Sequence, residues 1–236
     1  MVGLKFQICG YGACLPSRQM QNADLAGELG ADETWIERRC GIRSRFVAEE
    51  ETTRTLAVGA ARKAMGMAPD IRPDLVICST FTPEYFLCPT APAIAHDLGL
   101  SMPGAIDLNA ACAGGVVGIL TSLSFLFAGA AQAVLLVSAD TTTKFLARRD
   151  TQTRILFGDG AAAFVLQAAP FHGSRVRSYT CGSDGAGAPL FRLETCEDGG
   201  THAKPVAIRS SDVYGRLRSR WTGGHCSALP LNEDAR

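Results

Sequence analysis

The sequence lacks an excess of charge of either sign, because its 23 basic and 23 acidic side chains cancel. Binding to nucleic acid or to an anionic membrane surface depends on clustered positive charge. We therefore expect neither a nucleic-acid nor a membrane partner, which leaves a small molecule or another protein. With 236 residues, 47% of them hydrophobic, the chain is long enough for one large domain or two modest ones with a buried core.

The nine cysteines lack the paired spacing of a disulfide framework or a metal site. They are scattered through apolar sequence as Cys9, Cys14, Cys40, Cys78, Cys88, Cys112, Cys181, Cys196 and Cys226. This pattern is typical of reduced thiols in the cytoplasm. The segment from Met1 to Gly10 also lacks the apolar run and the cleavage site of a secretory signal. We expect a cytoplasmic protein without a metal.

Charged residues are absent from Leu108 to Ala139, a longer stretch than the roughly 20 residues needed to span a bilayer. A membrane helix is therefore one interpretation. Polar side chains such as Asn109 and Gln132, several glycines and the absence of flanking basic clusters favour another one. We expect a helix that is buried on all sides within a soluble domain.

Strand and helix patterns alternate along most of the chain. Short apolar runs predict strands over residues 5–10, 74–79, 104–108, 133–138 and 161–166. Amphipathic or apolar stretches predict helices over residues 23–29, 53–65, 90–98 and 114–130. This order predicts an α/β fold with a sheet buried on both faces. From about Gly182 the sequence turns to glycine, arginine and short polar runs, which predict no regular element.

One cysteine, Cys112, lies between an apolar strand and an apolar helix in the segment AIDLNAACAGGVVGIL. The small residues around it permit a tight turn and leave room for a substrate above the sulfur. N–H groups at a helix start favour a thiolate over a thiol. Cys112 is therefore the candidate nucleophile, although the local pattern alone also fits an inert buried cysteine.

Further motifs extend this pattern along the chain. DLNAACAGG resembles the active-site cysteine motif of the ketoacyl-ACP synthase III family, a group of thiolase-like condensing enzymes. The resemblance covers roughly residues 3 to 200, in order and with the family's spacing. It is carried by GACLP, NADLA, ETWIERRCGIRSRF and ETTRTLAVGAARKAM before the cysteine, and by LFGDGAAAFVL and GSDGAGAPL after it.

The resemblance implies an acyltransferase of fatty-acid or polyketide biosynthesis. Acyl-CoA would be a substrate, with no cofactor, and would acylate Cys112 before decarboxylative condensation with malonyl-ACP. Trp35 and Arg39 fall where the family holds the CoA adenine and phosphate. The implied fold is the layered αβαβα thiolase arrangement, usually as a homodimer. Residues 1–169 would form the amino-terminal half, and residues 170–236 the partial start of the second half with an atypical tail.

Two positions depart from the family pattern. Thr151 stands where the family has an arginine that stacks on the adenine, which puts the CoA affinity in doubt. The candidates to replace that arginine are Arg148, Arg149 and Arg154. Cys88 falls near the position of a large aromatic residue, so we expect an acyl specificity different from that of an acetyl-primed enzyme.

The family's condensing step needs a histidine and an asparagine from the second half of the fold, to stabilise the enolate. None of the four histidines lies in a segment that resembles the corresponding motif; they are His96, His172, His202 and His225. We therefore expect a chain truncated after the amino-terminal half. Two alternatives stay open, namely a non-condensing acyl transferase of the same family and a non-catalytic fragment or pseudoenzyme that pairs with a full-length relative.

Two other signals favour structural roles. Gly10-Tyr11-Gly12 matches the start of a dinucleotide-binding fingerprint, but Leu15 replaces its third glycine, so we do not expect NAD binding. Asp107 and Asp140 flank the uncharged region and permit a paired acid/base interpretation. We favour carboxylates at strand ends that accept hydrogen bonds from the backbone.

Overall fold

The computed structural model describes residues 5–146, 153–169, 173–183, 185, 193–194 and 204–205. The chain divides into two compact units, residues 1–145 with 155–182, and residues 146–154 with 183–236. In the second unit, β9 (Leu193–Glu194) and β10 (Lys204–Pro205) pair antiparallel. The division into two halves after residue 169 stays a prediction.

The first unit is built on a six-stranded sheet with the strand order β5-β4-β6-β7-β1-β8. Its strands are β1 (Lys5–Cys14), β4 (Leu75–Ser79), β5 (Gly104–Leu108), β6 (Ala133–Asp140), β7 (Gly160–Ala168) and β8 (Ser174–Arg175). β4 pairs parallel with both β5 and β6, whereas β7 is antiparallel to both β6 and β1. The parallel strands β4, β5 and β6 therefore end at the same edge of the sheet.

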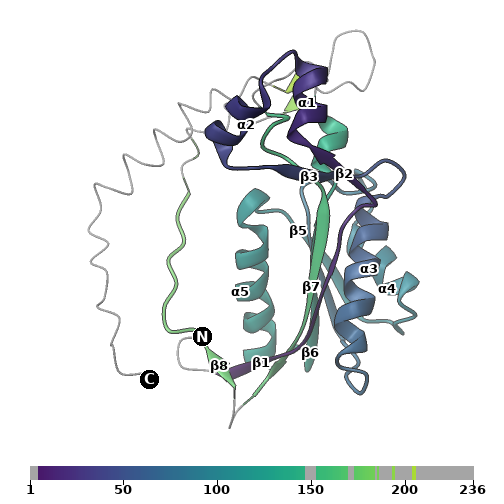
Figure 1. Cartoon of the computed structure of the whole chain (residues 1–236). Helices are drawn as coiled ribbons and strands as arrows, with labels where there is room; N and C mark the ends of the chain where they lie inside the picture. Colours follow the sequence, from purple (N-terminus) through teal and green to yellow (C-terminus); the bar gives the residue numbers. More distant parts are fainter. Residues whose placement is uncertain are drawn as a thin grey trace. The chain divides into compact units, whose positions relative to one another are not determined.

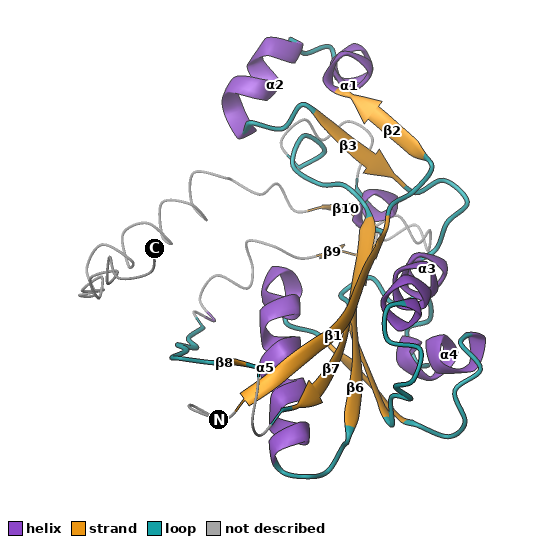
Figure 2. Ribbon diagram, turned by 60° about the horizontal axis from the view of Figure 1, so that its bottom comes forward, coloured by secondary structure: helices purple, strands orange, loops and turns teal. Residues whose placement is uncertain are grey.

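Helices cover both faces of this sheet. Figures 1 and 2 show α3 (Thr53–Gly66) and α4 (Thr90–Asp97) on one face and α5 (Gly114–Phe127) on the other. One core cluster joins α3 and α4 to the sheet through residues such as Leu56, Ile94 and Val137. A second cluster joins α5 to the opposite face, with Leu123 and Leu136 at its centre. These layers confirm the predicted α/β class.

The helix α5 corrects one expectation. Its side that faces the sheet is buried, but the side chain of Val116 in its first turn is 67% exposed. The prediction of a helix buried on all sides is therefore wrong for the described first unit, in which α5 packs against the sheet on one side only. Among the described residues, no helix has both the length and the apolar character required to cross a membrane.

A small cap lies over the edge of the sheet at which β6 ends (Figure 1). It consists of the antiparallel strands β2 (Arg18–Gln21) and β3 (Ser44–Val47) and of the two helices that connect them, α1 (Asn22–Leu29) and α2 (Glu33–Cys40). Leu25 and Ile36 form its own core cluster together with Ile155. The Asp159 N–H donates to the Phe46 carbonyl oxygen at 2.9 Å, which ties the cap to the sheet.

Candidate active site

Cys112 lies in a tight elbow between β5 and α5, as the sequence predicts. A short 3₁₀ turn (Ala111–Ala113) carries it, and the thiol is free and exposed. Ala111, directly before it, has a φ of 46°, a left-handed conformation that costs free energy in a residue with a Cβ. Strain of this kind is typical of functional turns that hold a nucleophile away from the surrounding backbone.

Asn109 stabilises this strained turn. Its side-chain oxygen accepts a hydrogen bond from the Ala111 N–H at 3.1 Å, and the Ala113 N–H donates to the Ala110 carbonyl oxygen at 3.1 Å. Asn109 was not predicted as a site residue, although asparagine two residues before a turn N–H is a known turn signal. The helix that follows has Ala113 at its N-cap and no side-chain cap.

Two glycines of α5 bring the elbow close to the sheet. A Cβ on Gly114 would lie 2.1 Å from the Ser79 Oγ of β4, and one on Gly118 would lie 2.7 Å from the Leu136 Cδ1 of β6. Both distances are below any real contact of a Cβ. The glycines after Cys112 therefore allow α5 to lie directly against the end of β4 and the middle of β6.

A buried cysteine near this edge, Cys78, is inert. Cys78 lies on the neighbouring strand β4 and is fully buried. Burial, with a further contribution from the negative charges of Asp107 and Asp140, raises the pKa of its thiol far above the ordinary value. Because only the thiolate is a good nucleophile, Cys78 has no role as an acyl acceptor, in contrast to the exposed Cys112.

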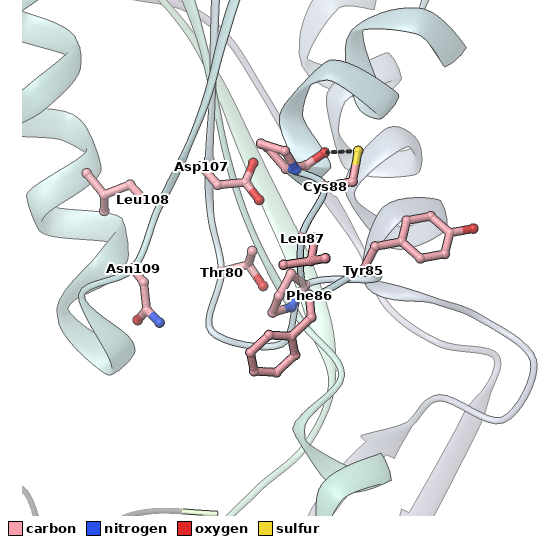
Figure 3. Close-up of a pocket in the computed structure, with 10 residues that line it drawn as sticks. Thr80, Tyr85, Phe86, Leu87, Cys88, Asp107, Leu108 and Asn109 are labelled. Carbon is pink, nitrogen blue, oxygen red and sulfur yellow. Dashed lines mark hydrogen bonds between the residues drawn. The ribbon is translucent and has the colours of Figure 1, made fainter. Parts of the chain in front are cut away.

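A groove of about 250 Å³ adjoins the elbow. Asn109 and Leu108 line it on the β5 side, and the segment between β4 and α4 lines it on the other, including Tyr85, Phe86 and Cys88. Figure 3 shows the side chains of Thr80 and Asp107 on the side of this segment, while Leu108 points toward α5. The groove thus reaches from Cys88 to a residue three positions before Cys112.

Asp107 and Asp140 both accept hydrogen bonds at strand ends, which confirms the structural interpretation of these carboxylates. Asp107 accepts from the backbone N–H groups of Thr90 and Ala91 at the start of α4. Asp140 accepts from the loop that follows β4. Burial raises the pKa of Asp140, although its hydrogen bonds act in the opposite direction.

Trp35 and Arg39 lie on α2 of the cap and are both exposed. Their spacing of four residues places them on one face of the helix, while Ile36 is fully buried beneath it. Their assignment to CoA stays a prediction. Thr151, Arg148 and Arg149 lie outside the described residues. Within the described ranges, no three His, Cys, Asp or Glu side chains gather as a metal site would require.

The chain is similar to known proteins along most of its length. The family model for 3-oxoacyl-[acyl-carrier-protein] synthase III matches residues 106–185, which include the elbow. Beta-ketoacyl-[acyl-carrier-protein] synthase III 3 of Streptomyces coelicolor is 39% identical over 214 residues, which is 89% of this chain and 62% of that protein. The corresponding protein of Brucella melitensis is 42% identical over 169 residues, which is 70% of this chain and 52% of that protein. The chain thus spans between half and two thirds of the length of these curated relatives.

Solved structures give the same result for the fold. This chain superposes with a TM-score of 0.84 on the crystal structure of 3-oxoacyl-(acyl carrier protein) synthase III from Pseudomonas aeruginosa. The two sequences are 34% identical, and the match covers 90% of this chain and 67% of the Pseudomonas chain. The priming β-ketosynthase of the R1128 polyketide pathway superposes with a TM-score of 0.78 at 30% identity, over 92% of this chain and 65% of that one. The collinear motifs, the cysteine elbow and these similarities lead to one conclusion: the chain belongs to the thiolase-like ketoacyl-ACP synthase III family.

Proposed function

We propose that this chain carries the acyl-accepting site of a condensing enzyme of the 3-oxoacyl-ACP synthase III type. The Cys112 thiolate attacks the thioester carbonyl of an acyl-CoA, a new thioester forms on the sulfur, and CoA leaves as its thiol. The observation that supports this most directly is the exposed Cys112 thiol, held in a strained turn beside a groove of about 250 Å³. A free thiol in such a position is a candidate for covalent catalysis.

In the second step, malonyl-ACP loses carbon dioxide and the resulting carbanion attacks the thioester carbonyl on Cys112. The product is a 3-oxoacyl-ACP, and the Cys112 thiolate is regenerated. The histidine and asparagine that the family uses to stabilise the enolate have no matching segment in this sequence. A non-condensing acyl transferase, which needs only the first step, is the second candidate.

The partners follow from the same proposal. Acyl-CoA would contact the exposed face of α2 through Trp35 and Arg39, and an acyl carrier protein would deliver the malonyl group. The similarity to synthases III and to a polyketide priming enzyme supports a place in fatty-acid or polyketide synthesis. A cytoplasmic location is part of the same proposal. The edge strand β5, with exposed apolar residues nearby, supports a homodimer.

Intact-protein mass spectrometry after incubation with a series of acyl-CoAs tests the first step. We expect a single acyl adduct that hydroxylamine removes, because it is a thioester. The adduct is expected to disappear in Cys112→Ala and to persist in Cys181→Ala, which is a matched control because Cys181 is also free and exposed.

Release of carbon dioxide from malonyl-ACP by the acylated chain then separates the candidates. Acylation with release of carbon dioxide and formation of a 3-oxoacyl product supports the condensing enzyme. Acylation followed only by transfer or hydrolysis supports the non-condensing transferase. No adduct on Cys112 with any acyl-CoA would contradict the proposal and favour a non-catalytic chain that pairs with a full-length relative.

A further inference from the structure

The segment from Thr80 to Pro89 connects β4 to α4 and forms one wall of the groove, whose other wall ends at Asn109, three residues before Cys112. Its central residues do not pack against the first unit, since the side chains of Phe86 and Leu87 are 100% and 98% exposed. Apolar contacts of these two side chains therefore do not fix the position of this wall. Between its ends, the Thr52 hydroxyl donates a hydrogen bond to the Glu84 side chain at 3.1 Å. The larger sets of hydrogen bonds act at its two ends.

Asp140 holds the first end. A single oxygen of this carboxylate, Oδ1, accepts hydrogen bonds from the Thr80 hydroxyl at 3.0 Å, the Phe81 N–H at 2.9 Å, the Thr82 N–H at 3.1 Å and the Thr82 hydroxyl at 2.8 Å. The Thr141 N–H donates back to the Thr82 hydroxyl at 2.9 Å. Thr80 and Thr82 are buried, so these groups have no water to replace a lost acceptor.

Asp107 holds the second end. One of its oxygens accepts from the Thr90 N–H and the other from the Ala91 N–H, each at 2.7 Å. Residue Pro89 occupies the N-cap of α4 and has no side-chain acceptor for these first-turn N–H groups. The carboxylate of β5 therefore takes the place of the missing cap and fixes where the segment enters α4.

We infer that Asp107 and Asp140 are positioning residues which hold the groove wall at a fixed place relative to Cys112, and thereby set which acyl chains reach its sulfur. Asp107 lies on β5, five residues before Cys112, and Asp140 ends β6, whose Leu136 packs against α5. The wall and the nucleophile are thus fixed to the same edge of one sheet. This inference rests on the proposed function.

The hydrogen-bond pattern provides a conservative variant. All four donors to Asp140 converge on one oxygen, so the amide oxygen of Asn in Asp140→Asn is able to accept from them, whereas Asp140→Ala removes the acceptor. A residue that worked by its charge or by proton transfer would lose function in both variants. If Asp140 instead positions the wall, the wall is displaced in the alanine variant and stays in place in the asparagine variant.

The matched control is Asp74→Ala. Asp74 also accepts from two backbone N–H groups, those of Gln132 and Ala133. These contacts lie where β4 and β6 start, at the opposite end of the strands from the groove wall. Removing the Asp74 carboxylate takes an acceptor away from backbone N–H groups, as the other alanine variants do, but it leaves the groove wall unchanged. It therefore separates a general loss of stability from a displaced wall.

Two measurements on the full chain test the inference. Hydrogen–deuterium exchange of the peptide that covers residues 80–91 is expected to rise at least tenfold in Asp140→Ala and Asp107→Ala, and to stay near wild type in Asp140→Asn and Asp74→Ala. The rates at which acetyl-, butyryl- and octanoyl-CoA acylate Cys112 are expected to change in ratio by about tenfold in the two alanine variants only. If Asp140→Ala does not fold, Asp107→Ala and the near-isosteric Thr80→Val take its place.

The outcomes are distinguishable. Unchanged exchange over residues 80–91 in both alanine variants overturns the inference whatever the activity of the chain. Faster exchange with unchanged ratios between the acyl-CoAs overturns the specificity role while the proposed function stands. Wild-type chain that accepts no acyl group at Cys112 overturns the proposed function and with it the role in acyl selection.

Discussion

Gly10 and Gly12 of β1 allow the helix α3 to lie directly on the sheet. A Cβ on Gly10 would lie 2.0 Å from the Ala64 carbonyl oxygen, and one on Gly12 would lie 2.4 Å from the Ala60 carbonyl oxygen. Both contacts are with carbonyl oxygens of the helix backbone, which cannot move unless the helix moves with them. The pair that superficially resembles a nucleotide fingerprint is thus explained by close packing between a strand and a helix.

We therefore predict that Gly10→Ala lowers the free energy of unfolding by about 1–3 kcal/mol, because the added methyl group forces α3 away from β1. Gly27→Ala is the matched control, since Gly27 lies within α1 and a Cβ there would meet nothing within 4 Å. Alanine at that position is expected to raise the free energy of unfolding by about 0.5–1 kcal/mol.

Urea unfolding followed by circular dichroism measures both effects. Equal stability changes of the two variants would contradict the packing role of Gly10, because both substitutions differ from wild type by the same methyl group.

The residues of the candidate site differ in how far the sequence predicts them. Cys112 is recognisable because its signal is local, a cysteine among small residues between a strand and a helix. Asn109 has a local signal as well, in its distance of two residues from the turn N–H. The contacts of Asp140 with Thr80 and Thr82 join residues about sixty positions apart, so only the folded sheet reveals them.

At the scale of elements, a bidentate ion pair joins α3 to α4. The Nε and Nη2 atoms of Arg54 donate to the two oxygens of Asp97 at 2.7 and 2.6 Å, and both side chains are less than a third exposed. The Arg54 hydrogen bonds hold the pKa of Asp97 below its ordinary value. The ionised carboxylate is therefore more stable in the folded than in the unfolded chain.

The sign of the pH dependence follows from this shift. The pair contributes stability above the unfolded pKa of Asp, about 3.9, and loses it as the pH falls through the lower folded value. We predict that Arg54→Gln lowers the free energy of unfolding by about 1 kcal/mol at pH 7, and that the difference from wild type shrinks below about pH 4.

Arg43→Gln is the control for this prediction, because Arg43 makes a single contact with Glu37 and is 82% exposed. Its effect is expected to stay within about 0.5 kcal/mol. Urea titrations at pH 7 and near pH 3.5 give both values. A difference for Arg54→Gln that persists unchanged at the lower pH would show that the ion pair is not its source.

Regular elements with a strong apolar pattern were predictable from the sequence. Strand β5 has the predicted bounds, and α3 and α5 end within three residues of the predicted ends. Of the cap, the helix α1 was predicted over residues 23–29. The other cap elements were not predicted, since α2 has only one buried residue and β2 and β3 have four residues each. Their hydrophobic pattern is too short for a periodic signal, and long-range pairing in the fold decides their structure.

At the scale of the whole molecule, the order of strands leaves β5 at one side of the main sheet in the described part of the chain. Ile106 on this terminal strand is 37% exposed. Phe86 and Leu87, with nearly complete exposure, border the groove beside the end of β5. An open edge next to exposed apolar side chains favours association. A partner would form hydrogen bonds with the unpaired N–H and C=O groups of the strand and would bury the apolar surface.

If the chain forms the proposed homodimer through β5, Ile106→Lys is expected to weaken it at least tenfold, since two lysines would meet near the axis that relates the copies. Ile8→Lys on β1 is the matched control, because Ile8 is also exposed, at 47%, but lies at the far side of the sheet from β5. Sedimentation velocity over a range of concentrations measures the dissociation constant of each variant. A wild-type chain that stays monomeric would contradict association through β5, and so would an equal rise of the dimer's dissociation constant in both variants. A rise in Ile106→Lys alone would show that the two copies contact each other through β5.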